Sequence, residues 1–186
     1  MRLVFSEEKA TQAAAYLLAR FGGQQNYMKL LKMLYLADRK ALLETGYTIT
    51  GDLMYALRHG PVLSQIYNLI AEEAETPTRW TQCIRRIAPY DIAIAQSPGD
   101  DELSEYERSV LDTIYETFGG IDKWTLNRET HQLPEWQDPG PSRIPIDPSD
   151  ILRLEGVDAE EVRRIVQEAE ERWQMHFIHP TKSHSS

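Results

Sequence analysis

The fold is decided by residues 26–70, which read NYMKLLKMLYLADRKALLETGYTITGDLMYALRHGPVLSQIYNLI. Apolar side chains return every three to four residues from position 27 to about 44, which is the period of an amphipathic helix. We expect this helix to begin after Asn26, whose side chain can accept hydrogen bonds from the first free backbone N–H groups. Residues 47–57 have no dominant period, and we expect them to be irregular, with room for a short helix or strand.

Positive charge gathers on one side of the expected helix. At about 100° per residue, four basic side chains fall opposite the apolar arc: Lys29, Lys32, Arg39 and Lys40. The favoured interpretation is a solvated helix face, because an amphipathic helix needs one. The sharper hypothesis is a basic stripe on which a partner docks.

Asp38 breaks the pattern, because it projects near the middle of the apolar arc. An unpaired carboxylate is costly to bury, so we expect a partner, which would be a backbone N–H, Arg58 or a histidine. A structural anchor is favoured over a catalytic acid. Tyr55 and His131 are assigned the same role of structural polar anchor.

The segment Arg58-His59-Gly60-Pro61-Val62 contains the least ordinary loop of the chain. Proline suits the first position of a helix, and glycine frees the backbone before it. We therefore expect a second helix from Val62 to Ile70. The simple interpretation is a helix start, and the alternative is a pocket for an anion or carboxylate, because Arg58 and His59 would flank free N–H groups.

The rest of the chain predicts a mainly helical (α+β) fold with a small β-hairpin or short strands around residues 84–95. Hydroxyl and carboxylate side chains precede further helical patterns and are expected to cap them: Ser6, Ser104, Asp122, Asp147 and Asp158. We expect one compact domain over residues 1–178. Residues 179–186 are expected to form a disordered tail.

Composition narrows the class of protein. The 186 residues carry 20 basic and 29 acidic side chains, a net charge of −9, which argues against a general nucleic-acid binder. No apolar run approaches the roughly 18–20 residues that span a bilayer, and Cys83 is the only cysteine. We expect a cytoplasmic protein without a disulfide framework and without membrane association.

Chemical motifs are sparse. The sequence contains no Gly-rich phosphate loop, no nucleophile elbow and no zinc-ligand spacing, so we expect no cofactor and no metal. His59, His131 and Asp38 are the candidates for an acid–base site, and they keep a small hydrolase or transferase as an alternative. Trp136, in the loop after Pro134, is expected either to close the core or to anchor a partner.

The residues around positions 29–37, followed by Tyr55, His59-Gly60-Pro61-Val62 and Tyr67, resemble the Panacea, or SocA-like, antitoxin domain. The similarity continues downstream and spans about residues 28–146, through the following residues: Leu103, Ser104, Glu105, Leu126, Thr130, His131 and Trp136. In this family a tyrosine or similar residue often precedes the glycine, where this chain has His59. The order and spacing of these short motifs carry the resemblance.

The resemblance implies a mostly helical, non-enzymatic antitoxin that binds a toxin encoded by a neighbouring bacterial or phage gene. One branch of the family acts instead as an adaptor that delivers its toxin to the ClpXP protease. Only about 25 residues precede the similarity, so autoregulation through an extra DNA-binding module is not expected. The resemblance leaves open whether the protein forms a homo-oligomer. We predict that the docking surface is formed or bordered by these residues: Lys29, Lys32, Arg39, Lys40, Arg58, His59, Gly60, Pro61, Val62 and Trp136.

Overall fold

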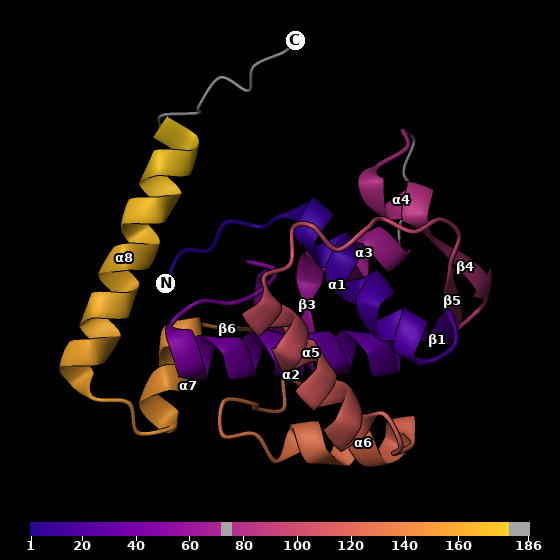
Figure 1. Cartoon of the computed structure of the whole chain (residues 1–186). Helices are drawn as coiled ribbons and strands as arrows, with labels where there is room; N and C mark the ends of the chain where they lie inside the picture. The colour runs from indigo at the N-terminus through magenta and orange to yellow at the C-terminus, as the bar shows by residue number, and fades with distance from the viewer. Residues whose placement is uncertain (72–75, 179–186) are drawn as a thin grey trace, which may run out of the picture.

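A central helix organises the computed structural model, which describes residues 1–71 and 76–178. Helix α2 (Tyr27–Thr45) runs through the middle of the molecule (Figure 1). As predicted, Asn26 caps it by accepting hydrogen bonds from the N–H groups of Met28 and Lys29, at 3.2 and 3.4 Å. Gly46 ends it with a φ of 78°, a left-handed conformation that glycine adopts without strain.

Helices cover α2 on several sides. Helices α1 (Glu7–Arg20) and α5 (Glu105–Phe118) pack on α2 and on each other. Helices α6 (Lys123–His131) and α7 (Pro148–Leu154) contact it as well, and α8 (Ala159–Ile178) packs on α7 at one edge of the molecule (Figure 1). The predicted caps Ser6, Ser104, Asp122 and Asp147 accept hydrogen bonds from the first turns of their helices, and Asp158 accepts one from the N–H of Glu160.

The predicted hairpin around residues 84–95 is confirmed. Strands β4 (Ile84–Ala88) and β5 (Asp91–Ile94) pair antiparallel, and β1 (Gln24–Asn26) adds to the far side of β5. The short helix α4 (Arg79–Cys83) leads directly into β4. Since β1 ends where α2 begins, this sheet lies beside the N-terminus of α2.

A second sheet was not predicted. Strand β2 (Met54–Leu57) lies between β3 (Gly60–Leu63) and β6 (Ile144–Ile146), and both neighbours pair with it antiparallel. Proline fits β3 because this strand lies at the edge of the sheet, where a missing N–H costs little.

The expectation of a helix start at Gly60-Pro61 is wrong. Both residues belong to β3, and helix α3 (Ser64–Ala71) begins only at Ser64. The N–H of Ser64 donates to the carbonyl of Leu53 at 2.9 Å, and those of Gln65 and Ile66 donate to the buried carboxylate of Asp52 at 2.9 Å each. These groups do not lie free beside Arg58 and His59, so the alternative of an anion pocket at this helix end is wrong as well.

One continuous hydrophobic cluster joins the helices and both sheets. It includes Leu34 and Tyr35 of α2, Leu111 of α5, Leu63 of β3 and Ile151 of α7. Helices predominate and both sheets are small, so the α+β prediction is confirmed. None of the described helices is both long and apolar enough to cross a membrane. The tail predicted for 179–186 lies outside the described residues.

Candidate functional site

A pocket opens where the N-terminus of α2, the hairpin of β2 and β3, and the start of α6 meet. Its volume is about 540 Å³, within the range of roughly 300–1,000 Å³ that is typical of ligand pockets. We call it the Lys32 pocket, and these residues line it: Asn26, Tyr27, Met28, Lys32, Leu57, His59, Gly60, Val62, Tyr67, Tyr90, Lys123, Trp124 and Asn127.

Lys32 is the buried charge of this pocket. Only 2% of the residue is exposed, and its ammonium group donates to the backbone carbonyl of His59. Desolvation lowers the pKa of Lys32 to about 8, and no neighbouring carboxylate opposes that shift. A buried charge without a counter-charge is costly to the fold, so a group of this kind in a pocket marks a candidate functional site.

Gly60 forms the wall beside the lysine. Its φ is 95°, and a Cβ atom at this position would lie 2.5 Å from Lys32 Nζ and 2.9 Å from Thr130 Oγ1. Glycine is required here both for the backbone conformation and for the close approach of the lysine. His59 precedes it and is exposed at the rim.

Aromatic rings form much of the remaining wall. The rings of Tyr27 and Tyr90 stack with their centroids 6.3 Å apart, and Trp124 is 64% exposed. Lys123 Nζ lies 5.1 Å from the centroid of the Trp124 ring and 5.9 Å from that of Tyr90. The lining contains no aspartate or glutamate, although the chain as a whole has a net charge of −9.

His131 and Trp136 contact the backbone of the turn between β2 and β3. Trp136 Nε1 donates to the carbonyl of Leu57 at 3.0 Å, and His131 Nε2 lies 3.1 Å from the carbonyl oxygen of Arg58. The two rings meet edge to face, with their centroids 4.2 Å apart. Trp136 therefore positions the hairpin as part of the core, and His131 has the anchoring contacts expected of it.

Comparison with known families gives a match over this part of the chain. A family model described as "Antitoxin SocA-like, Panacea domain" matches residues 30–137, more than half of the 186 residues. The chain belongs to this family. Its Panacea domain contains the buried lysine, the hairpin of β2 and β3, and helix α6. Comparisons with curated proteins and with solved structures gave no match.

The basic face predicted for α2 of this Panacea domain is not solvated. Lys29 and Lys32 are buried, at 7% and 2% exposure, and Lys29 Nζ donates to the carbonyl of Gly119 at 2.7 Å. The expectation of a solvated face is therefore wrong for both lysines. It failed because α5, α6 and the hairpin cover that side of α2, while the aliphatic stems of the lysines pack inside.

The other two basic residues of the stripe are neutralised by glutamates. Arg39 binds Glu135 at 2.8 Å and also pairs with Glu155, and Lys40 pairs with Glu44 one turn along the helix. These contacts leave Arg39 and Lys40 with little net positive charge to present to a partner.

Asp38 is anchored as predicted, by backbone N–H groups. It is fully buried and accepts from the N–H groups of Ile49 and Thr50, at 2.9 and 3.0 Å, and from the Thr50 hydroxyl. Burial raises the pKa of Asp38 to about 7, against the lowering effect of these hydrogen bonds. The carboxylate fixes residues 49–50 to the middle of α2.

The three residues of the acid–base hypothesis are not assembled into one site. Asp38 binds residues 49–50, and it does not line the Lys32 pocket. His131 contacts two backbone carbonyls, those of Asn127 and Arg58. His59 alone of the three lies at the pocket. Tyr55, the other expected anchor, is half-buried, with the Arg143 guanidinium 4.8 Å from the centroid of its ring.

The sequence did not predict the aromatic side of the Lys32 pocket. Tyr27, Tyr90, Lys123 and Trp124 come from three elements that no local pattern connects. One signal was available, because the tryptophan at position 124 lies in a short polar helix with few apolar neighbours, and an exposed tryptophan often marks a binding surface.

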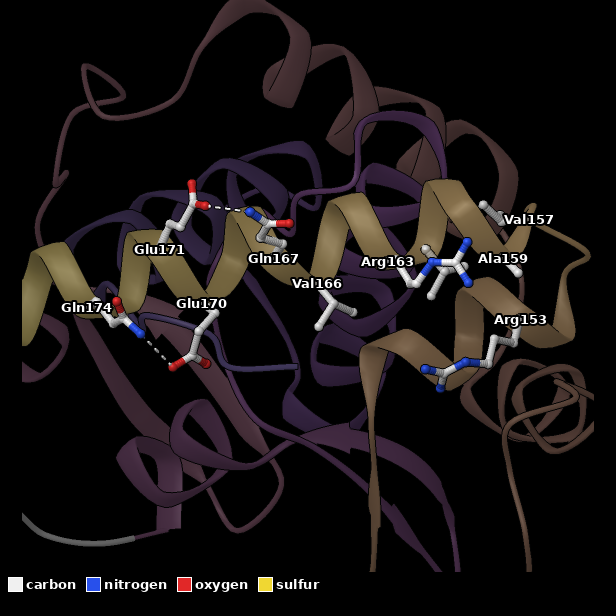
Figure 2. A pocket seen from close by; sticks show the side chains of 10 residues that line it. Arg153, Val157, Ala159, Arg163, Val166, Gln167, Glu170, Glu171 and Gln174 are labelled. Carbon is white, nitrogen blue, oxygen red and sulfur yellow. Dashed lines mark hydrogen bonds between the residues drawn. The ribbon is translucent and has the colours of Figure 1, made fainter.

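A second hollow lies at the opposite end of the molecule. It follows α8 beside the end of α7, has a volume of about 820 Å³ and is lined by Val157, Val166, Arg163 and Glu170 among others. Figure 2 shows Arg163, Val166 and Glu170 along α8, with Val157 just before its start. We call it the α8 groove. It lies outside the residues that match the Panacea family, and its lining carries both signs of charge.

Proposed function

We propose that this protein is an antitoxin that neutralises a toxin, encoded by a neighbouring gene, by binding it directly in the cytoplasm. Membership in an antitoxin family indicates a non-enzymatic role. The observation that supports direct binding most strongly is the Lys32 pocket, an apolar and aromatic hollow with a buried ammonium group and no carboxylate in its lining.

The docking surface that we propose centres on this pocket. His59 and Trp124 are exposed at its rim, and aromatic side chains carry much of the binding energy in protein interfaces. Arg58 is exposed on the same turn and would extend the surface. Gly60, Pro61 and Val62 are buried, so they would shape the surface rather than form its rim. Arg39 and Lys40 would contribute less, because glutamates already pair with them.

Co-expression with the neighbouring gene tests the proposal. We expect the toxin to arrest bacterial growth alone, and we expect growth to resume when this protein is co-produced. Tagged antitoxin should copurify the toxin in a defined ratio. Absence of both copurification and growth rescue would contradict the proposal.

The same strains separate direct masking from delivery to a protease. If masking alone operates, the half-life of the toxin stays unchanged while growth is rescued. If the protein is an adaptor, the half-life of the toxin shortens when the antitoxin is present, and deletion of ClpXP restores it. A hydrolase or transferase would instead modify the toxin, which mass spectrometry of the copurified toxin would reveal.

A further inference from the structure

The Lys32 ammonium group can donate a hydrogen bond to a further acceptor. An ammonium carries three N–H donors, and the described contact uses one of them, on the His59 carbonyl. No carboxylate of the described residues pairs with it. The group therefore lies at the pocket as a desolvated positive charge with donors to spare.

The surroundings of this charge favour an anion. Lys123 adds a second cation to the lining, and outside the lining the Arg86 guanidinium lies 5.5 Å from the centroid of the Tyr27 ring. Helix α2 begins at the pocket, and its cap, Asn26, is neutral, so the positive end of the helix dipole is not cancelled there. The lining thus carries two lysines and no carboxylate, while Asp122 at the start of α6 is engaged by backbone N–H groups, and electrostatic complementarity favours a negatively charged partner group.

Backbone geometry argues against a phosphate chain as the negatively charged group that the pocket binds. Phosphate sites use free N–H groups at helix starts, and at both helices that open onto the pocket the cap side chain already accepts from such groups. Asn26 accepts from the N–H groups of Met28 and Lys29, and the N–H of Tyr27 donates to the carbonyl of Tyr90. At α6, Asp122 accepts from the N–H groups of Trp124 and Thr125, and its carboxylate would repel a phosphate beside this helix start. The lining also contains no arginine.

An acidic protein segment fits the same walls. A carboxylate needs few donors, which Lys32 and Lys123 can supply, and the remaining lining offers apolar surface from Met28, Leu57 and Val62. We propose that the Lys32 pocket receives an acidic segment of the toxin, whose aspartate or glutamate carboxylate pairs with Lys32 while a neighbouring apolar side chain packs against Tyr27, Tyr67 and Trp124. This inference rests on the proposed antitoxin function.

The decisive variant is Lys32→Met, which keeps the length of the side chain and removes the charge. We expect the Kd for the purified toxin, measured by calorimetry, to rise about 30-fold or more, the size of a hot-spot loss. Lys9→Met is the matched control, because Lys9 is a half-buried lysine of α1 that pairs with Glu107 away from the pocket. We expect Lys9→Met to change the Kd by less than about 3-fold.

A folding defect is separated from a binding defect by two further measurements. Lys32→Met should keep the circular dichroism spectrum of the wild type and should not melt at a lower temperature, because the change removes an unpaired buried charge. Trp124→Ala alters an exposed side chain and should also raise the Kd about 10-fold or more without unfolding the protein. Wild-type affinity in both folded variants overturns the inference.

The carboxylate itself is identified by a double-mutant cycle. Each surface aspartate of the toxin is changed to asparagine and each surface glutamate to glutamine, and we expect one such variant to lose affinity for the wild-type antitoxin and to lose no further affinity when it is combined with Lys32→Met. ATP and inorganic polyphosphate serve as competitors. Displacement of the toxin by either one, with no effect of any toxin carboxylate, would show a small-anion site and overturn the inference.

The outcomes distinguish this inference from the proposed function. If the wild-type protein neither binds nor neutralises the toxin, both fail together. If the wild type neutralises the toxin and Lys32→Met and Trp124→Ala do so equally well, the antitoxin function stands and the assignment of the pocket fails.

Discussion

Asp38 shows how a single buried carboxylate fixes a loop to the central helix. Its oxygens accept two backbone N–H groups and one hydroxyl, and Asp38→Ala leaves these three donors without an acceptor. We expect a loss of about 3–5 kcal/mol in the free energy of unfolding, measured in urea. Asp150→Ala serves as the control, because this exposed aspartate pairs with Arg153 in solvent, and we expect a change of about 0.5 kcal/mol or less. Equal effects of the two changes would contradict the anchoring role.

The pH dependence of stability tests the same residue. Burial raises the pKa of Asp38 to about 7 from 3.8, so the folded state binds its proton more tightly than the unfolded state does. The resulting contribution to stability is complete below pH of about 4 and is lost as the pH rises through about 7. Asp38→Asn removes this titration. We expect the free energy of unfolding of the wild type, relative to Asp38→Asn, to fall between pH 5 and pH 7.5. Parallel curves in urea titrations at several pH values would contradict this assignment.

Single positions were predictable to different degrees. The helical arc alone placed Asp38 inside and required a partner, which the structure confirms. The partner could not be identified, since residues 47–53 have no periodicity and depend on tertiary contacts. Lys32 was predicted on a solvated face, because helical spacing reports which side of a helix is apolar and cannot report what other elements cover the polar side.

At the scale of elements, one of the two hairpins was predictable from its local sequence and the other was not. Residues 84–95 carry isoleucines among polar neighbours with Pro89 between the pairs, and this pattern predicted a hairpin. The other hairpin contains Gly60-Pro61, a dipeptide that also suits a helix start. In the structure Gly60 and Pro61 pair with Leu57 and Ala56 of β2. The other edge of β2 pairs with β6, about ninety residues later in the chain, and this long-range pairing leaves no local signal.

Gly60 tests the hairpin and the pocket together. Gly60→Ala puts a Cβ atom at a φ of 95° and within 2.9 Å of Thr130 Oγ1. Gly22→Ala is the matched control, since Gly22 has a φ of 76° and nothing within 4 Å of its added Cβ atom. We expect about 1 kcal/mol of destabilisation for Gly22→Ala from the backbone alone, and about 1–2 kcal/mol more for Gly60→Ala from crowding. Thermal unfolding measures both. Equal losses of stability in the two variants would mean that the added Cβ atom is not crowded beside Lys32.

At the scale of the whole molecule, α2 separates two hollows. The Lys32 pocket lies at its N-terminus, and the α8 groove lies beyond its C-terminus, where Gly46 meets Ile165 of α8. A helix of 19 residues is about 28 Å long, so one change cannot contact both sites. Helices α7 and α8 lie outside residues 30–137, which match the Panacea family, and Figure 1 shows α8 at one edge of the molecule.

This separation allows the docking surface to be located with two matched variants. Trp124→Glu and Val166→Glu each place a carboxylate at an apolar position, the first at the rim of the Lys32 pocket and the second at a half-buried side chain of the α8 groove (Figure 2). We expect Trp124→Glu to abolish growth rescue, because a carboxylate at the aromatic rim repels the acidic segment of the toxin and removes the apolar contact of the ring. Val166→Glu should leave rescue intact in protein that is still folded by circular dichroism. The reverse result, in which Val166→Glu fails to rescue and Trp124→Glu succeeds, would move the toxin to α8. It would also mean that the extension beyond the matched residues, rather than the part shared with the family, carries recognition.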